Sequence, residues 1–536
     1  MSIDTLRPDG WPAPARTGTL PSSASHGVPT AASFPAALGL CLGAAMALAI
    51  AAALTGGTLG ALTSLVLLAG ATIVFAAQGR DLWALGTFFT YAALEGMYKY
   101  LTSYSQAVYV VKPLLIVVLV GGWLLHRKRQ TGRAPAPPLV AATMLFIIWS
   151  FLMAFHPAGG GVAGGVATAI LWYGGPAAFY YMGHHAAQRS VANVERILYV
   201  LGAVSTMVSA FALVQYLMGQ PWTEAHLPGY ATMSRTSASW FVADESKGGF
   251  VAGWRPASTT SMPGGGAFYA YLGVLFTFGL LLRPSITLRT RITLIVCSLL
   301  NFVALLVTGV RLYVVILMFA APLLLLLSAR TPRVLGRNAG FAVLAAMICL
   351  GGFLTAQMLS GGALIHRYAE TLANPMARYQ KDRGGSLTYL PTFLSANPFG
   401  MGYQRGVEGY SQQGFARKYG SNSTLASLNR ETQFNSVAID MGLPGLVLLV
   451  GLLVAILVQG WRALRLLSDP SLRVLGATLF VLLCGYAMAC LGGPALQGAD
   501  PFWTAAALLF SLPLLQNQNR QRRSATSGLP PQAQRP

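Results

Sequence analysis

Long apolar runs alternate with short polar connections along this chain, from residue 34 to residue 515. Most runs approach the ~20 residues that a helix needs to cross a bilayer, whose core offers no water to an irregular backbone. The pattern predicts an all-α polytopic membrane protein with about 14 transmembrane helices. The predicted spans are 34–54, 59–77, 82–101, 107–125, 139–155, 166–182, 197–218, 267–282, 292–307, 312–327, 339–358, 437–458, 474–491 and 502–515.

Two long polar segments interrupt this alternation. A loop of that length is usually functional or disordered. The second segment carries apolar and aromatic residues along its length, such as Leu364 and Phe393, so we expect a folded, partly helical cap. The predicted organisation is a disordered tail (1–32), spans (33–218), a first loop (219–266), spans (267–358), a large second loop (359–434), spans (435–515) and a second tail (516–536).

Positive charge separates the two sides of the predicted membrane. Short loops on one side are rich in Arg and Lys, as cytoplasmic loops are, whereas short loops around residues 103, 158 and 495 have almost none. Both tails are therefore predicted to be cytoplasmic and both long loops to face outward. The cations on the predicted inner side are Arg80, Arg127, Lys128, Arg129, Arg133, Arg189, Arg196, Arg283, Arg289, Arg291, Arg330, Arg333, Arg337, Arg462, Arg465, Arg473, Arg520, Arg522 and Arg523.

The composition excludes a soluble protein, because 54% of the 536 residues are hydrophobic and only 10% are charged. The net charge of +21 follows the predicted topology, so it does not indicate a nucleic-acid partner. All five cysteines lie in predicted spans, and neither they nor the scattered histidines show metal-ligand spacing. We expect no metal and no other cofactor.

Arginine on the outer side is not needed for orientation, and it indicates an anionic partner. Arg255 precedes hydroxyl residues and the glycines 264–266 at the start of a span, where a guanidinium and free glycine amides can cradle an anion. Arg311 begins the span 312–327 at the same predicted boundary, where the positive end of the helix dipole also favours an anion. The alternative for Arg255 is an interfacial Arg that follows an anchoring Trp, with the glycines forming a turn. The alternative for Arg311 is a snorkelling Arg held by lipid phosphate.

The second loop supplies further candidates for contacts with an anionic glycan donor. Arg fits phosphate oxygens bidentately, and aromatic rings suit the apolar faces of sugars. Each of these residues alone is better explained as a solvated surface group, and only the cluster as a whole indicates a binding surface. The predicted substrate-binding residues are His366, Arg367, Arg378, Tyr403, Arg405 and Arg430.

Acidic residues are scarce near the predicted outer boundary. Glu431 follows Arg430 where the chain re-enters the membrane, so its carboxylate could accept a proton from a sugar hydroxyl. The alternative is an Arg430–Glu431 pair that stabilises the end of the loop. Glu95 and Lys99 lie four residues apart on one helical face and could pair within the membrane.

The order and placement of four motifs resemble the O-antigen ligase and polysaccharide polymerase family of bacterial membrane glycosyltransferases. The motifs are Arg-Pro-Ala-Ser-Thr-Thr-Ser (255–261), Thr-Gly-Val-Arg (308–311), Asn-Pro-Phe-Gly-Met-Gly-Tyr (397–403) and Asp-Met-Gly-Leu-Pro-Gly (440–445). The resemblance covers residues 82–458 approximately. It implies a multi-pass protein of the inner membrane that uses undecaprenyl-diphosphate-linked oligosaccharides at the periplasmic face, together with other polysaccharide assembly proteins.

One departure from the family pattern distinguishes the ligases from the polymerases. Ligases of this family typically carry His-Asn where this chain has Glu431 and Thr432, so the resemblance favours an exopolysaccharide or O-antigen polymerase. On this interpretation Arg255 and Arg311 hold the lipid diphosphate, and Glu431 orients or deprotonates the acceptor. Transfer is expected to need no metal and to invert the anomeric carbon.

Three alternatives stay open at the level of the sequence. An O-antigen ligase would bind the same donor but transfer the glycan to a lipid A core. A transporter of a small anion would place charged or unwound segments near mid-membrane, and only Glu95, Lys99 and Lys112 favour this alternative. A non-catalytic subunit of a polysaccharide export complex would need no active site.

Overall fold

The chain divides into two units, Met1–Ala44 and Ala45–Pro536. The computed structural model describes residues 43, 47, 49–52, 55, 57–129, 136–231, 254–284, 286–329, 331–359, 368–369, 373–403 and 432–527. The predicted tail 1–32 and most of the first predicted span lie outside these residues. Apart from residue 43, every described residue belongs to the second unit.

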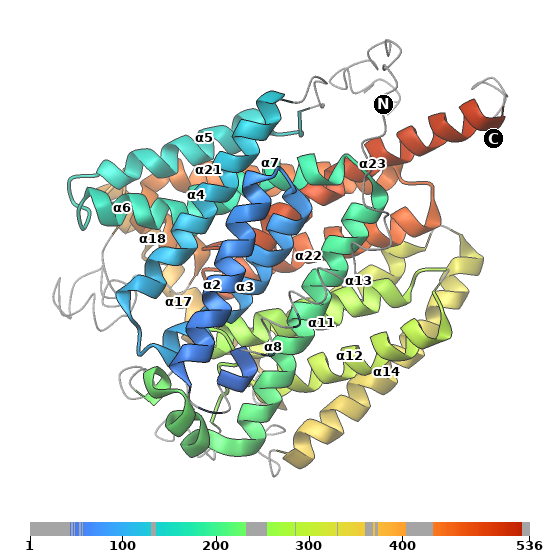
Figure 1. The fold of residues 1–536 in the computed structure, drawn as a ribbon, viewed down its shortest axis with the longest axis horizontal. Helices are drawn as coiled ribbons and strands as arrows, with labels where there is room; N and C mark the ends of the chain where they lie inside the picture. The colour runs from blue at the N-terminus through green and yellow to red at the C-terminus, as the bar shows by residue number, and fades with distance from the viewer. Residues whose placement is uncertain are drawn as a thin grey trace. The chain divides into compact units, whose positions relative to one another are not determined.

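The described part of this unit is helical and contains no β-strand, as the apolar pattern predicted (Figure 1). Each predicted span from 59–77 onward falls, to within one residue, in one helix or one continuous run of helices. The helices that contain the predicted spans are α2 (Thr58–Ala77), α3 (Asp81–Leu101), α4 (Gln106–Arg129), α5 (Val140–Leu152), α6 (Val162–Thr168), α7 (Gly174–Ala187), α8 (Val191–His226), α11 (Pro263–Leu281), α12 (Leu288–Val307), α13 (Arg311–Ser328), α14 (Pro332–Leu359), α21 (Gln433–Leu466), α22 (Pro470–Gly492) and α23 (Asp500–Ser527).

Nine helical segments within the described ranges are long and apolar enough to cross a membrane. The protein is therefore a multi-pass membrane protein. Helix α3 is not among the nine, although it is a continuous 21-residue helix with many buried side chains. The predicted number of about 14 spans stays a prediction.

Apart from α6 and α7, which form one continuous run, successive long helices reverse direction, so their connections alternate between two ends of the bundle. One end, here called the site end, holds the α3–α4, α8–α11, α12–α13, α14–α21 and α22–α23 connections. The opposite end holds the α2–α3, α7–α8, α11–α12 and α21–α22 connections, which carry the arginines that the sequence placed inside. Which end faces the cytoplasm stays a prediction.

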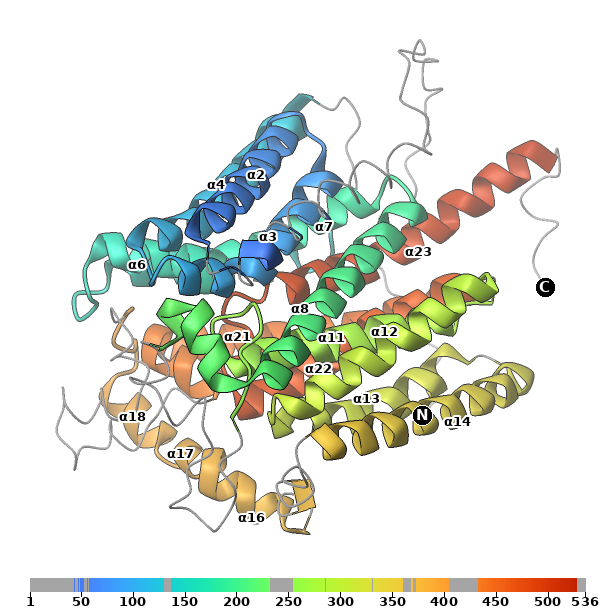
Figure 2. The same cartoon turned by 60° about the horizontal axis from the view of Figure 1, so that its bottom comes forward.

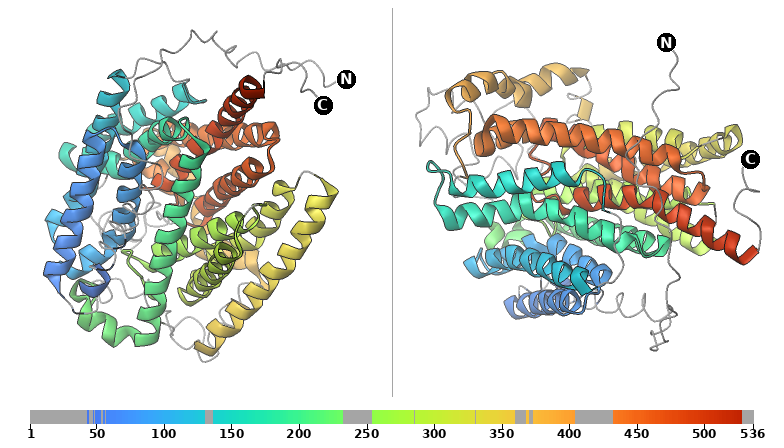
Figure 3. Two further views of the ribbon diagram at one scale, coloured as in Figure 1. Left: turned by 45° about the vertical axis from the view of Figure 1, so that its right-hand side comes forward. Right: turned by 90° about the horizontal axis from the view of Figure 1, so that it is seen from above.

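Helices from distant parts of the chain pack side by side. Helix α23 packs against α7 and α22, and α21 packs against α5 and α22 (Figure 3). Helix α3 packs against α2 and α8. The start of α23 is thereby brought to the region of α3 and α4, so charged residues of these three helices can interact.

Helix α21 is broken at a glycine, and part of the second loop forms hydrogen bonds with the helix at this break. Gly442 has φ 65°, and Leu443 N–H donates to Pro398 O at 2.8 Å. On the other side of the break, Met401 N–H donates to Ile439 O at 2.7 Å. Residues of the third and fourth motifs thus bond directly to one another.

Part of the second predicted loop is helical and lies alongside the bundle (Figure 2). It forms α16 (Pro375–Tyr379), a π-helical turn (Gln380–Gly384), α17 (Gly385–Leu387) and α18 (Leu390–Ala396). Phe393 of α18 is buried against Ile439 of α21. This contact fixes one helix of the loop on the membrane helices.

Candidate functional site

Two arginines from different connections meet at the site end. Arg255 precedes α11, and Arg311 is the first residue of α13. The pKa of Arg255 is lowered to about 10, first because the side chain is partly buried and second because the positive charge of Arg311 lies nearby. Arg255 therefore remains charged at neutral pH, beside a like charge. The structure brings together two of the three residues predicted to be catalytic.

The surroundings of Arg255 favour an anion. Its Nε atom is buried and has no hydrogen-bond partner among the described residues. A buried donor without a partner is unfavourable, and so is a second cation beside it. An anion with several oxygens would relieve both, because a guanidinium offers a planar set of N–H donors.

The segment that follows Arg255 is bonded into helix α3. Met97 N–H donates to Thr259 O at 2.8 Å, and the Thr259 hydroxyl donates to Ala93 O at 2.6 Å. Ala93 O is also the i−4 acceptor that corresponds to Met97 N–H in an α-helix. Thr259 is thus held between two successive turns of α3, and this position fixes the segment that carries Arg255.

A glycine of α3 makes this close approach possible. A Cβ atom at Gly96 would lie 2.0 Å from the carbonyl carbon of Thr260, which is far inside van der Waals contact. One turn further along, the Tyr100 hydroxyl donates to Ser261 O at 2.7 Å. The backbone of the first motif therefore lies directly on α3.

Helix α8 holds the other side of the same segment. Ser258 N–H donates to Gln215 Oε1 at 2.7 Å, and Gln215 Nε2 donates to Ser258 O at 3.3 Å. The Ser258 hydroxyl donates to Val208 O. Ser258 has φ 61°, a left-handed conformation that is uncommon for a residue with a side chain. These bonds account for its persistence.

The residue before Arg255 is also fixed. Trp254 Nε1 donates to the Tyr230 hydroxyl at 2.7 Å. The Trp254 ring is stacked with Tyr216, with ring centroids 6.5 Å apart. Arg255 is therefore held from both directions along the chain.

The prediction that free glycine amides at the start of α11 bind an anion is wrong for two of the three glycines. The N–H groups of Gly265 and Gly266 both donate to Met262 O, at 3.0 and 3.3 Å, so they are not free for an anion. A Cβ atom at Gly265 would lie 2.7 Å from the Thr260 hydroxyl oxygen. Close packing therefore explains this glycine.

The turn that carries Arg311 is tight and is contacted by the second loop. Gly309 has φ 64°, and the Thr308 hydroxyl donates to Leu305 O at 2.7 Å. The Tyr368 hydroxyl donates to Leu306 O at 3.1 Å. Tyr368 is also close enough to Arg255 to raise the pKa of its guanidinium, although less than burial and Arg311 lower it. The beginning of the second loop thus reaches the arginine pair.

Most of the site residues predicted in the second loop lie outside the residues that the structure describes. Glu431, the third predicted catalytic residue, lies outside the described residues, as do His366, Arg367, Arg405 and Arg430. The backbone of Arg378 belongs to α16. Their roles stay predictions.

Tyr403 is the only predicted substrate-binding residue whose side chain is described. It is 2% exposed, and its hydroxyl donates to Ser150 O at 2.8 Å. Its ring is stacked with Tyr173, whose hydroxyl donates to Asp440 Oδ2 at 2.9 Å. These contacts account for Tyr403 without a substrate, and we assign it a structural role between the third and fourth motifs.

A buried charge network joins three helices near the site end. Lys99 Nζ lies 2.6 Å from Glu95 Oε1, as the sequence spacing suggested. Lys112 Nζ of α4 lies 3.5 Å from Glu95 Oε2 and 3.7 Å from Asp500 Oδ2 of α23. We call these four residues the charge network. The sequence did not single out Asp500, although an acid just before a predicted span was visible.

The charge network and the Arg255 segment share helix α3. Glu95 lies between Ala93 and Met97, the two residues that bond Thr259. On α11, Tyr269 is within electrostatic range of Lys112 and of both carboxylates. The network therefore lies beside the backbone that positions Arg255.

Within the described ranges, no group of three or more His, Cys, Asp or Glu side chains is placed to hold a metal ion. Comparison of the chain with models of known protein families finds no match, and comparison with curated proteins finds none.

Proposed function

We propose that this protein is a membrane glycosyltransferase, a polymerase of exopolysaccharide or O-antigen. Its donor is a glycan linked to a polyprenyl diphosphate, and its acceptor is a lipid-linked repeat unit. The observation that carries the proposal is the pair Arg255 and Arg311 at one end of the bundle, with the Nε of Arg255 buried and without a hydrogen-bond partner among the described residues. The family resemblance of the four motifs supports the same donor class.

In this glycosyl transfer the protein mainly has to stabilise the leaving group, polyprenyl diphosphate. The acceptor hydroxyl attacks the anomeric carbon, the bond from that carbon to the phosphate oxygen breaks, and the hydroxyl proton passes to a base. Polyprenyl diphosphate leaves with the bonding electrons. Arg255 and Arg311 would stabilise its growing negative charge, and Glu431 is our candidate for the base. Attack opposite the leaving group inverts the anomeric carbon.

The direct test uses purified protein in nanodiscs with a synthetic repeat unit on polyprenyl diphosphate. The wild type should produce a ladder of longer lipid-linked glycans. The same preparation, offered a lipid A core as acceptor, should transfer little glycan to it. Transfer to the lipid A core without a ladder would instead identify a ligase, and absence of both products would overturn the proposal.

The charge network favours a second candidate, a carrier of a small anion. Ionisable groups buried in membrane helices commonly mark an ion pathway. Such a carrier should move radiolabelled bicarbonate or phosphate into liposomes, and cells that lack it should not accumulate lipid-linked oligosaccharide. The polymerase predicts the opposite result in both assays.

A further inference from the structure

Like charges repel, so the surrounding helices must impose the spacing of Arg255 and Arg311. Arg255 belongs to a segment that is bonded to α3 and α8, whereas Arg311 begins α13, which packs most extensively against α22. Helix α11 follows the Arg255 segment and packs against α13, so it forms one link between the two arginines. A second link runs through residues 493–499, here called the α22–α23 connection.

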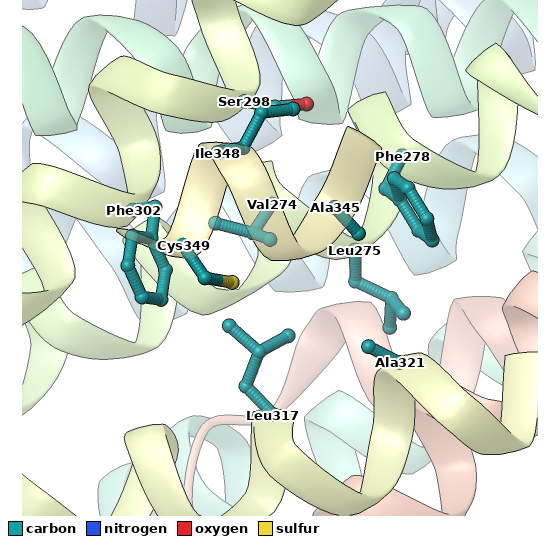
Figure 4. A pocket seen from close by; sticks show the side chains of 10 residues that line it. All are labelled: Val274, Leu275, Phe278, Ser298, Phe302, Leu317, Ala321, Ala345, Ile348 and Cys349. Carbon is teal, nitrogen blue, oxygen red and sulfur yellow. The ribbon is translucent and has the colours of Figure 1, made fainter. Parts of the chain in front are cut away.

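The α22–α23 connection begins close to Arg311. A Cβ atom at Gly492, the last residue of α22, would lie 2.8 Å from Leu312 Cδ1, so α22 and α13 are in tight contact there. Another face of α13 borders an apolar cavity of about 40 Å³, with Leu317 and Ala321 in its wall (Figure 4). At about 3.6 residues per turn, these two side chains lie roughly opposite Leu312 around the helix. The start of α13 is therefore held from the α22 side.

The connection itself is anchored on two further elements. Leu496 N–H donates to Gln433 Oε1 at the start of α21 at 2.8 Å. The Gln497 amide donates at 2.9 Å to the hydroxyl of Tyr173, which ends the π-helical turn before α7. Gly498 has φ 65°, which allows the tight turn into α23. These contacts fix the path of the chain from α22 to α23.

The connection leads into the charge network at Asp500. Lys112 Nζ lies 3.7 Å from Asp500 Oδ2 and 3.5 Å from Glu95 Oε2. Glu95 and Lys99 share one face of α3, whereas residues 93, 96, 97 and 100 share another face and contact the segment 259–261. The turn of α3 that positions Arg255 is thus tied, on a different face, to the α22–α23 connection.

The use of charge at this link indicates a role other than stability. Burial of ions carries a desolvation cost, and apolar side chains of similar volume often hold helices together equally well. Asp500 Oδ1 is buried without a hydrogen-bond partner among the described residues, so Asp500 relies mainly on Lys112 to compensate its charge. Both carboxylates are compensated only while Lys112 lies between them. The network therefore favours one arrangement of α3, α4 and α23.

We propose that the α22–α23 connection sets the spacing between Arg255 and Arg311, with Lys112 and Asp500 as positioning residues. This inference rests on the proposed function. Both residues act through α3 and not by contact with the donor. The donor carries its diphosphate as a diester, and cleavage leaves a monoester with greater negative charge, so correct spacing of the two cations matters most in the transition state.

A comparison of kcat with KM tests the positioning role. Asp500→Asn keeps the size of the side chain and removes its charge. We expect kcat for glycan elongation to fall at least tenfold, whereas KM for the lipid-linked donor should change less than threefold. Lys112→Arg should retain most of the rate that Lys112→Met loses. The matched control is Asp469→Asn, at the N-cap of α22 at the opposite end of the bundle, which should leave kcat unchanged.

The double variant Lys112→Met/Asp500→Asn separates positioning from folding. Joint removal of the two charges leaves Glu95 paired with Lys99, so the thermal unfolding midpoint should recover much of what Lys112→Met alone loses. The value of kcat should stay low, because the link between α3 and the connection is still missing. Recovery of kcat together with the unfolding midpoint would show a purely structural network and overturn the inference.

Inorganic diphosphate tests the spacing without catalysis, because it resembles the leaving group in charge. Calorimetric titration in nanodiscs should show binding to the wild type, binding at least fivefold weaker to Asp500→Asn, and unchanged binding to Asp469→Asn. Weaker binding to Asp500→Asn in a protein that elongates no glycan would support the spacing role and refute the polymerase. Normal kcat and normal diphosphate binding in Asp500→Asn would refute the spacing role and leave the proposed function standing.

Discussion

Arg255 lies outside the helices, and the segment that carries it is positioned by bonds to neighbouring helices. Its segment bonds to α3 through Thr259 and to α8 through Ser258, and its charge lies close to that of Arg311. Such fixed donors stabilise developing charge better than mobile ones, because they need no reorganisation during the reaction. Single residues at this site should therefore have large effects on rate.

Replacement of Arg311 tests the leaving-group role. Arg311→Ala should lower the rate of glycan elongation by about 10²–10³-fold, the usual loss for one group that stabilises transition-state charge. Arg311→Lys should retain an intermediate rate, because Lys keeps the charge but lacks bidentate geometry. Initial rates and product lengths measure both effects. A ladder of unchanged length and rate for Arg311→Ala would refute the assignment.

Gly96→Ala tests the contact that holds the Arg255 segment. The new Cβ would meet the Thr260 backbone at 2.0 Å, and overpacking of this kind costs about 1–3 kcal/mol. We expect a lower thermal unfolding midpoint and a lower rate of glycan elongation. Gly121→Ala is the matched control, because nothing lies within 4 Å of its Cβ. Equal behaviour of the two variants would contradict the proposed contact.

At the scale of elements, the break in α21 links the membrane helices to the second loop. Gly442 has a positive φ, and a Cβ there would lie 2.3 Å from the carbonyl carbon of Phe399. Trp149 Nε1 of α5 donates to Met441 O at 3.1 Å, so a third element meets at the break. One glycine thus permits three segments to approach.

Gly442→Ala should therefore displace residues 398–401 and destabilise the protein. We expect a lower unfolding midpoint together with faster proteolysis of the second loop. Gly451→Ala in the same helix has open space around its Cβ and should change neither measurement. If both variants unfold and digest alike, the loop does not depend on this break.

The sequence predicted helices well and their mutual contacts poorly. Apolar runs located the helices, because a span must be long and lack charge. Helix α3 fitted this pattern least well, since Glu95 and Lys99 lower its hydropathy. The two residues pair with each other, and Lys112 of α4, which also pairs with Asp500 of α23, lies beside Glu95. The alternation of spans placed Arg255 and Arg311 at one end.

The finer geometry of the site depended on contacts between distant residues. No local pattern reveals that Thr259 bonds to Ala93, which lies 166 residues earlier. The local sequence also predicted that the N–H groups of Gly265 and Gly266 bind an anion, whereas both donate to Met262 O. The contacts of Tyr403 with Ser150 and Tyr173 likewise join residues far apart in the sequence.

At the scale of the whole molecule, the charge network joins early and late parts of the chain. Lys112 lies between Glu95 and Asp500, and all three side chains are largely buried. Removal of one partner from such a buried arrangement leaves an uncompensated charge, whereas joint removal of both partners can be nearly neutral.

Lys112→Met should accordingly destabilise the protein by about 3–5 kcal/mol. Addition of Asp500→Asn should recover part of the loss, as a double-mutant cycle would measure from unfolding in detergent. Lys99→Met should cost less, because Lys112 would still neutralise Glu95. Additive losses for Lys112→Met and Asp500→Asn would show that the two charges do not interact.

The bonds between Thr259 and α3 bear on how the protein is made. Helix α3 leaves the ribosome long before Thr259 exists, so its turn at Ala93–Met97 enters the membrane without the partner that it has in the finished protein. We expect nascent chains that end before Thr259 to hold this helix loosely, in the insertion machinery or against α2. The polypeptide would then acquire its cation pair only after more than half of the helices had been inserted, which delays any premature capture of lipid during biogenesis.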